Sequence, residues 1–409
     1  MFGKKIDPKT IPEVNIGVLG HVDHGKTTLT QAITGKMTDT HSEEIRRGIS
    51  IRLGYADTTF YKCKKCDSYS TTEKCPKCFG DTDIQRTVSF VDTPGHESLM
   101  AVVLTGSSLI DGAILIIAAN EKCPSPQTRE HMTALDVVGI KNIIIVQNKV
   151  DLVKEERVKE SYKEIKEFIK GTVAENSPII PVSAMRRVNI EYVIEAIENN
   201  IPTPKRDLSK DPKMYVARSF DVNKPGSTID KLVGGVIGGS IIEGELKKGQ
   251  EIELRPGIRT EDSWKPLKSK IISMEKGGKK LDKAGAGGLL GMMTPLDPAL
   301  TKADGLVGNI VGLPGKLPES RHKINLEINL LERVVGAKEE MEVENIKLNE
   351  PLMINIGTGR SVGVVTKLGD KNIELTLKLP ICAEKGERIV ISRQIRKRWR
   401  LIGYGILKE

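Results

Sequence analysis

Residues 20–27 read Gly-His-Val-Asp-His-Gly-Lys-Thr and lie between an apolar run at Val14–Leu19 and a helical pattern at Lys26–Ile33. A glycine-rich loop between a strand and a helix is the context in which a Walker A motif works. The glycines let backbone N–H groups turn toward phosphates, and the N-terminus of the helix adds positive potential. The loop therefore predicts a nucleoside triphosphate site. The plainer alternative is a glycine-rich turn with no ligand.

The polar residues of this loop have expected tasks at such a site. Lys26 would reach the β- and γ-phosphates, and the Thr27 hydroxyl would hold a magnesium ion. In this part of the chain, nucleotide contacts are expected from Asp23, His24, Gly25, Lys26, Thr27 and Thr28.

A second loop, Asp92-Thr93-Pro94-Gly95-His96, follows the apolar run Val88–Val91. Asp92 at the end of such a strand can bind a water molecule that coordinates magnesium, and Gly95 can turn its N–H toward a γ-phosphate. An Asp-x-x-Gly sequence alone is usually a simple turn. Its place one strand away from the phosphate loop makes it a predicted part of the same site.

The identity of the base is predicted by Asn148-Lys149-Val150-Asp151, which ends a further strand. A carboxylate at Asp151 can accept hydrogen bonds from the ring N–H and the exocyclic amine of guanine, whereas adenine offers no such pair of donors. Asn148 would tie this loop to the phosphate loop, and Lys149 would lie over the base. The backbone of Ser183-Ala184-Met185 can donate an N–H to the guanine carbonyl. The alternative is an ordinary turn in which Asp151 caps a helix.

Four of the six cysteines form two closely spaced pairs, Cys63 with Cys66 and Cys75 with Cys78. Two such C-x2-C knuckles can place four thiolates tetrahedrally around zinc, and no ligand position is then left open for water. We therefore expect a structural zinc site. Disulfides are the competing explanation, and iron can also occupy a site of four thiolates. Cys123 and Cys382 stand alone and are interpreted as ordinary thiols.

Outward from the phosphate loop, the first half of the chain alternates short apolar runs with helical patterns. This alternation predicts an α/β P-loop domain, with a mostly parallel sheet and helices on both faces, over residues 1–205. The expected strands are Val14–Leu19, Val88–Val91, Ala113–Ala119, Asn142–Gln147 and Ile179–Val182, and the later helices are expected at Val153–Lys170 and about Ile190–Glu198.

After Met214 the pattern changes to short apolar runs separated by glycine-rich turns, which is typical of β-barrels or sandwiches. Examples are Tyr215–Phe220, Leu232–Ile237 and Glu251–Leu254. A Pro/Gly-rich segment at Leu313–Pro318 divides this half into two blocks. We therefore expect two all-β barrel domains, over residues 206–318 and 319–409.

The 409-residue chain carries a net charge of +9, which points toward an acidic partner such as nucleic acid, and a solvated lysine-rich surface is the plainer alternative. Five of the eight residues at 393–400 are basic, so this segment could contact a phosphate backbone or form a charged edge strand. No signal peptide and no apolar run long enough to span a bilayer is present, so we expect a cytoplasmic protein with no membrane partner.

Several motifs together resemble those of translational GTPases. They are GHVDHGKTT at 20–28, RRGISI at 46–51, DTPGHE at 92–97, NKVD at 148–151 and SAM at 183–185. The cysteine pairs lie between the second and third of these motifs. That insertion, with the segments EVNIGVLGHVDHGKTTL and HSEEIRRGISIRLGYAD, is similar to the gamma subunits of archaeal and eukaryotic translation initiation factor two, and the archaeal form is the closer fit.

The resemblance implies a GTPase that carries methionylated initiator tRNA to the small ribosomal subunit, as the core of a heterotrimer with an alpha and a beta subunit. It also implies that His96 positions the attacking water and that Val22 gates that histidine. Magnesium is implied near Asp23, Thr27, Gly48 and Ser50. Many relatives have threonine where this chain has Ser50, and a serine hydroxyl can make the same contact.

Other functions remain open at this point. A selenocysteine-specific or general elongation factor belongs to the same class, although the first usually has a C-terminal extension and the second usually lacks the cysteine knuckles. The GTPase subunit of a sulfate-activating enzyme is a metabolic alternative. A structural RNA-binding scaffold with a degenerate nucleotide site is the third alternative.

Overall fold

The computed structural model describes residues 6–37, 54–93, 109–224, 226, 228, 232–261, 263–334 and 341–408. The chain forms two compact units, the first spanning Met1–Pro204 and the second containing Lys205–Val334 and Glu340–Glu409. Each unit is described by itself.

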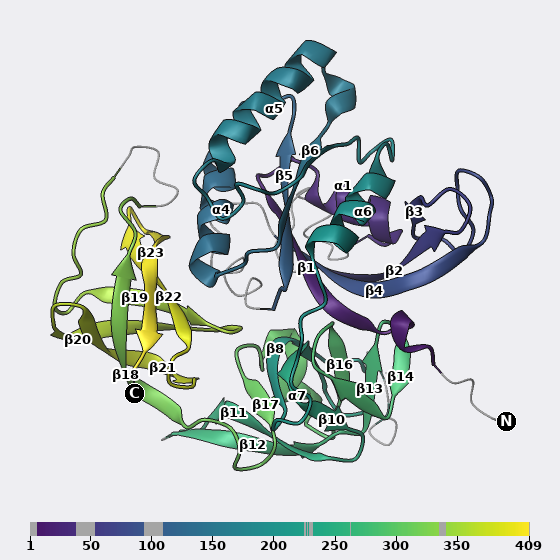
Figure 1. Cartoon of the computed structure of the whole chain (residues 1–409). Coiled ribbons are helices and arrows are strands. Elements are labelled where there is room, and N and C mark those ends of the chain that lie inside the picture. The colour runs from purple at the N-terminus through teal and green to yellow at the C-terminus, as the bar shows by residue number, and fades with distance from the viewer. Residues whose placement is uncertain are drawn as a thin grey trace. The chain divides into compact units, whose positions relative to one another are not determined.

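The first unit is built on a seven-stranded sheet with the order β3-β2-β4-β1-β5-β6-β7 (Figure 1). The run from β4 to β7 is parallel, whereas β2 and β3 join antiparallel at one edge. The strands are β1 (Pro12–Gly20), β2 (Gly54–Cys63), β3 (Tyr69–Ser70), β4 (Thr82–Asp92), β5 (Gly112–Ala118), β6 (Ile143–Asn148) and β7 (Ile179–Pro181). Every residue of β5 and β6 is buried, as expected for parallel strands covered on both faces.

Helices cover both faces of this sheet (Figure 1). α1 (Lys26–Thr34) and α6 (Ile190–Asn200) share one apolar cluster with β1, β5 and β6. α4 (Pro126–Val138) and α5 (Glu155–Ile169) cover the opposite face. Two short 3-10 helices complete the described part of this unit, η1 (Pro8–Thr10) and η3 (Val150–Leu152).

The predicted P-loop architecture is confirmed, and each expected strand lies within or overlaps an observed one. Among the longer elements, β2 and α4 were not predicted. The antiparallel strand β2, next to the short edge strand β3, has no clean alternation, because its partly buried face carries threonines, tyrosines and a lysine. α4 was missed because its buried face includes Thr128, Glu130 and His131, which do not read as apolar.

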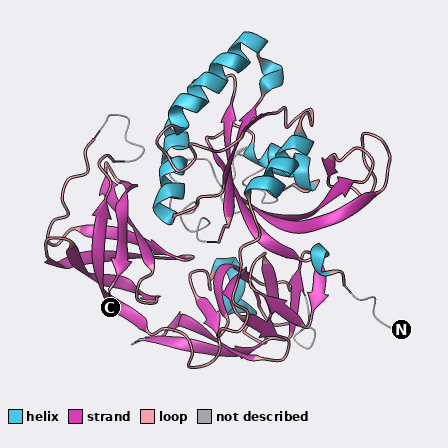
Figure 2. Cartoon of the chain, in the orientation of Figure 1, coloured by secondary structure: helices cyan, strands magenta, loops and turns pink. Residues whose placement is uncertain are grey.

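The first half of the second unit forms an eight-stranded antiparallel sheet with the order β12-β11-β17-β8-β9-β16-β13-β14, and a small β10-β15 pair. Figure 2 shows that this unit consists mostly of strands. Its strands are β8 (Lys213–Phe220), β9 (Val236–Glu243), β10 (Glu245–Lys247), β11 (Glu251–Arg259), β12 (Trp264–Lys270), β13 (Ser273–Lys276), β14 (Lys279–Leu281), β15 (Lys283–Gly285), β16 (Leu290–Met293) and β17 (Ile310–Gly312). Helical structure here is limited to α7 (Pro298–Thr301) and η5 (Lys302–Asp304) among the described residues.

The second half of this unit is a closed six-stranded barrel with the order β18-β21-β20-β19-β22-β23. Its strands are β18 (Ser320–Leu330), β19 (Pro351–Ile356), β20 (Gly359–Leu368), β21 (Asn372–Cys382), β22 (Arg388–Ile395) and β23 (Arg398–Leu407). Alternating aliphatic side chains fill its interior, so the predicted all-β character of this half is confirmed. The division of the whole chain into three domains stays a prediction.

Candidate functional site

The phosphate loop joins the carboxyl end of β1 to the start of α1. Its backbone has positive φ at Gly20 (147°), Asp23 (62°) and Gly25 (92°). A Cβ at Gly25 would lie 2.3 Å from Asn148 Nδ2, and one at Gly20 would lie 2.4 Å from the Ile116 carbonyl oxygen. Both glycines are therefore required by close approach as well as by conformation.

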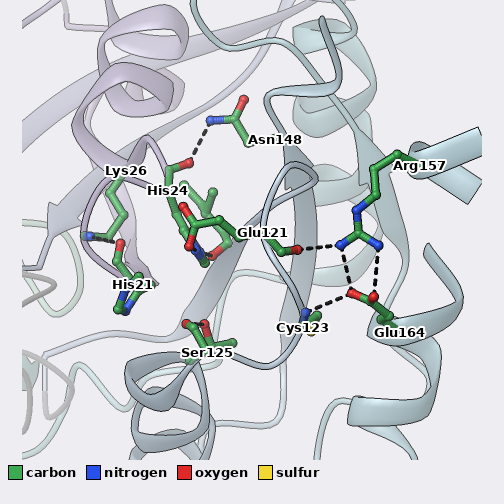
Figure 3. Close-up of polar contacts among 11 residues, drawn as sticks. His21, His24, Lys26, Glu121, Cys123, Ser125, Asn148, Arg157 and Glu164 are labelled. Carbon is green, nitrogen blue, oxygen red and sulfur yellow. Dashed lines mark hydrogen bonds and ion pairs between the residues drawn. The ribbon is translucent and has the colours of Figure 1, made fainter. Parts of the chain in front are cut away.

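Lys26 begins α1, and its ammonium folds back over the loop. Lys26 Nζ donates to the His21 carbonyl oxygen at 2.7 Å (Figure 3). The first intrahelical bond, from Leu29 N–H to Gly25 C=O, follows at 2.8 Å. The N-terminal N–H groups of this nine-residue helix therefore lie at the loop together with a fixed cation, an arrangement suited to phosphate.

Thr27 and Asp92 come together at the ends of neighbouring elements. The Thr27 hydroxyl donates to Asp92 Oδ2 at 2.8 Å, and the Asp92 side chain is buried. The adjacent Thr93 hydroxyl donates to the Val18 carbonyl at 2.7 Å, which fixes the end of β4 against β1. Magnesium prefers oxygen ligands such as hydroxyl and carboxylate groups, so Thr27 and Asp92 fit the predicted ion.

Asn148 links the two loops that were predicted to hold the two ends of a nucleotide. Its Nδ2 donates to the His24 carbonyl oxygen at 2.8 Å. Its Oδ1 accepts from the Ala184 N–H at 3.0 Å. Because both bonds are buried, one side chain fixes the spacing between the phosphate loop, the Asn148–Asp151 loop and the loop after β7.

Asp151 lies in η3, and its side chain contacts that of Ser183. The hydrogen bond with the Ser183 side chain lowers the pKa of the Asp151 carboxyl, and the Arg186 guanidinium, 3.1 Å away, adds to the effect. The group therefore stays a carboxylate, which can accept two N–H groups. Lys149 has a left-handed backbone (φ 63°), and Met185 is exposed.

The four clustered cysteines come together at the end of the β2–β4 ribbon, and their Sγ atoms all lie within 4.8 Å of one another. Cys63 Sγ is 3.4 Å from Cys78 Sγ, and Cys66 Sγ is 3.5 Å from Cys75 Sγ. A disulfide needs about 2.05 Å. Tetrahedral zinc with bonds of about 2.3 Å would place thiolates about 3.8 Å apart, so the donor set fits a metal.

Hydrogen bonds from the backbone prepare one of these thiols for the ionised form. The Lys65 N–H donates to Cys63 Sγ at 3.3 Å. Bonds from the N–H groups of Cys66 and Lys65 lower the pKa of Cys63 to about 6. A thiolate is the form that binds metal.

Comparisons with known proteins agree with this geometry. Residues 12–203 match the family model "Elongation factor Tu GTP binding domain", and residues 322–407 match "Initiation factor eIF2 gamma, C terminal". The chain is 59% identical over 401 residues to translation initiation factor 2 subunit gamma of Pyrococcus furiosus, which covers 97% of this chain and 98% of the relative. The corresponding subunit of Methanothermobacter thermautotrophicus is 58% identical over 407 residues, or 98% of this chain and 100% of the relative.

The chain belongs to the family of translation initiation factor 2 gamma subunits. It is a GTP-binding subunit of a translation initiation factor and a translational GTPase.

Solved structures of more distant proteins share the fold of this gamma-family chain. A bacterial selenocysteine-specific elongation factor superposes with a TM-score of 0.75 at 24% identity, over 97% of this chain and 58% of that one. The elongation factor SelB of Methanococcus maripaludis, solved with a GTP analogue, gives a TM-score of 0.72 at 23% identity, over 99% and 80%. At these identities the likeness shows the fold alone.

Some predicted site residues of the gamma-family chain lie outside the described ranges. They are Gly48, Ser50, Gly95 and His96, so their roles stay predictions. Of the remaining loop positions, Val22 and Thr28 are half-buried and Asp23 is exposed. In the part of the chain that the structure describes, no helix is long and apolar enough to cross a membrane.

Two residues at the phosphate loop were missed by sequence reasoning. His131 on α4 is buried, and its Nδ1 accepts from the Gly20 N–H at 2.9 Å. Glu121, after β5, places Oε2 3.2 Å from Nε2 of the buried His24, whose Nδ1 is 3.1 Å from the Ile116 carbonyl oxygen (Figure 3). A histidine on the inner side of an unrecognised helix gave no usable signal in the sequence.

The basic segment 393–400 forms the hairpin between β22 and β23. Its turn uses positive φ at Arg396 (49°) and Lys397 (66°). The Arg393 guanidinium binds the Glu350 carboxylate and donates to the Glu344 carbonyl oxygen at 2.9 Å. Arg393, the first basic residue of the segment, is therefore already paired with a carboxylate and a carbonyl oxygen of the same unit.

Proposed function

We propose that this chain binds GTP and GDP between the phosphate loop and the Asn148–Asp151 loop. In the GTP form it carries methionylated initiator tRNA to the small ribosomal subunit in the cytoplasm. It acts as the core of a heterotrimer with an alpha and a beta subunit. The observation that carries the nucleotide half is Asn148, whose amide fixes the phosphate loop against the base loop.

Specific roles follow for the nucleotide contacts. The N–H groups of the loop and of Gly25 would surround the phosphates, with Lys26 bridging the β- and γ-groups and His24 and Thr28 completing the shell. The Asp151 carboxylate would accept both N–H groups of guanine. Lys149 would lie over the base, while the backbone of Ser183, Ala184 and Met185 would meet the guanine carbonyl.

Magnesium would be held by the Thr27 hydroxyl and, through water, by Asp92. Thr27 Oγ1 and Asp92 Oδ2 lie 2.8 Å apart. Asp23, Gly48 and Ser50 complete the proposed set. When bound, the ion neutralises charge between the β- and γ-phosphates. The Thr27 hydroxyl donates to Asp92, and this bond keeps the two proposed ligands side by side.

Hydrolysis would use His96 to orient the attacking water, with Val22 as a hydrophobic gate beside it. Both roles are proposals from the family pattern. Hydrolysis is then conditional on a partner protein and the ribosome, which would set the position of His96.

Zinc would occupy the four cysteines as a closed structural site. The support is the donor set: four sulfur atoms within 4.8 Å of one another and no other ligand type among them. The site would fix the end of the β2–β4 ribbon.

The deciding experiment measures tRNA binding by the chain assembled with its alpha and beta subunits. Methionylated initiator tRNA should bind with GTP and not with GDP, and elongator methionyl-tRNA should bind much more weakly. Equal binding of the two tRNAs would favour an elongation factor. GTP turnover coupled to a small-molecule product, without tRNA, would favour the metabolic alternative.

A further inference from the structure

Arg157, in the first turn of α5, contacts both its own helix and the loop after β5. Its Nη1 and Nη2 bind the two Glu164 carboxylate oxygens at 2.9 and 3.1 Å. Its Nη2 also donates to the Glu121 carbonyl oxygen at 2.7 Å, outside the helix (Figure 3). Glu160 adds an ion pair at 2.9 Å.

Glu164 also reaches the same outside loop. Its Oε2 accepts from the Cys123 N–H at 2.9 Å. The ion pair thus binds a backbone carbonyl and a backbone N–H only two residues apart, which fixes the path of residues 121–123 against α5. Two-point contact with backbone groups constrains a loop more strongly than one flexible side-chain contact does.

The fixed loop carries the side chain that meets the phosphate loop. Glu121 Oε2 lies 3.2 Å from Nε2 of His24, whose side chain is buried. The carbonyl of the same His24 accepts from Asn148. The Asn148–Asp151 loop therefore fixes the backbone of His24, and the loop at residues 121–123 fixes its ring.

The ion pair has the geometry of a strong contact. Arg157 and Glu164 side chains are 24% and 20% exposed, and their contact is bidentate. By comparison, Lys159 and Glu155 on the same helix are 71% and 76% exposed and reach no other element. Pairs of that second kind contribute little.

We propose that Arg157 and Glu164 are positioning residues for the bound nucleotide. They hold Glu121 in place, Glu121 holds His24, and His24 keeps the phosphate loop in its phosphate-binding shape. Neither residue belongs to the proposed nucleotide contacts. The inference rests on the nucleotide site proposed above. It adds that these two residues slow the release of GDP and GTP.

The test measures release of GDP carrying a fluorescent methylanthraniloyl group from the full chain in magnesium buffer. Arg157→Met should speed release roughly tenfold, within the range expected for a coupled residue outside a site. Arg157→Lys can still donate to the Glu121 carbonyl, so its release rate should lie between those of the wild type and Arg157→Met. Lys159→Met, which removes the exposed ion pair on the same helix, should leave release unchanged.

A double-mutant cycle separates this role from general support of the fold. Glu121→Ala should also speed release, and Arg157→Met with Glu121→Ala should be no faster than the faster single variant, because both break one chain of contacts. Fully multiplicative effects would overturn the proposal. So would an Arg157→Met protein that melts earlier and yet releases GDP at the wild-type rate.

The two proposals fail in different ways. Absence of GDP binding by the wild-type chain would contradict the nucleotide site itself. Wild-type binding with unchanged release in Arg157→Met, or in Arg157→Lys and Glu121→Ala if the first variant does not fold, would contradict only the positioning role.

Discussion

Asp151 is the side chain proposed to decide which base is bound. Its carboxylate is kept ionised by the Ser183 side chain and by Arg186, so it offers only acceptors. Asp151→Asn replaces one acceptor with a donor, which would face the exocyclic amine of guanine. GTP affinity should fall roughly tenfold to a hundredfold, the cost of an unpaired polar contact.

Xanthosine triphosphate should bind this variant better than GTP, because xanthine has a carbonyl where guanine has the amine. Competition titrations with both nucleotides measure the change. Arg186→Met is the matched control, because Arg186 is 70% exposed and only supports the carboxylate. Unchanged GTP preference in Asp151→Asn would contradict the proposed base contact.

His131 contributes through the hydrogen bond that its Nδ1 accepts from the Gly20 N–H. His131→Leu leaves that N–H without its partner, whereas Asn can offer Oδ1 near the same position. We expect His131→Leu to weaken GDP binding roughly tenfold and His131→Asn to retain most of the affinity. Calorimetric GDP titrations of the three proteins check this, and equal loss in both variants would show that side-chain volume matters instead.

The same histidine makes stability depend on pH. Burial lowers the pKa of His131 to about 3, against an ordinary value of 6.5. Between these values the unfolded chain binds a proton that the folded chain does not, so the free energy of unfolding falls as the pH falls below 6.5. The slope from this group is at most about 1.4 kcal/mol per pH unit.

His131→Asn removes this dependence. Its free energy of unfolding should therefore change less than that of the wild type between pH 7 and pH 5. Urea unfolding followed by circular dichroism of the helices reports the difference. Parallel pH profiles for the two proteins would contradict a buried neutral imidazole.

Among the elements, the β2–β4 ribbon carries the four cysteines that are proposed to hold zinc. The β3 strand has two residues, and the loops between it and its neighbours are held by turns around the cysteines. Cys66→Ser should remove bound zinc and make residues 63–80 sensitive to protease, while the GTP site stays intact. Metal analysis and limited proteolysis measure both effects. Cys382→Ser, in the other unit, should keep its metal, and a protease-resistant Cys66→Ser ribbon would contradict the structural role.

The elements also show what sequence can predict. Runs such as β5 are apolar on both faces, and α5 has a clear apolar stripe at Ile165 and Ile169, so their type was recognised. The motifs could single out Lys26, Asn148 and Asp151 because each follows a strand whose carboxyl end lies at one sheet edge, and their nucleotide contacts stay predictions. His131, Glu121 and Arg157 could not be found this way. Their roles arise from contacts across 36 to 111 positions of sequence, which no local pattern encodes.

At the level of the whole molecule, the second unit joins an eight-stranded sheet to a closed barrel through a defined contact. Lys213 of β8 forms ion pairs with Glu387, next to β22, and with Glu384 at 3.5 Å. Ile310, Leu317, Cys382 and Tyr215 form an apolar cluster at the same junction. The Cys382 thiol donates to the Pro318 carbonyl oxygen at 3.0 Å.

This junction should make the two β modules unfold together. Lys213 is 9% exposed, so Lys213→Met removes the cation from two carboxylates and weakens the joint by about 1–3 kcal/mol, less than a fully buried pair because Glu384 is 53% exposed. Calorimetry of the full chain should then show the transition of the second unit broaden or divide in two. Lys210→Met mainly removes an ion pair with Glu243 of β9, and the Lys210 side chain is 59% exposed. It should leave the transition unchanged. If Lys213→Met behaves like Lys210→Met, the apolar cluster alone couples the two modules.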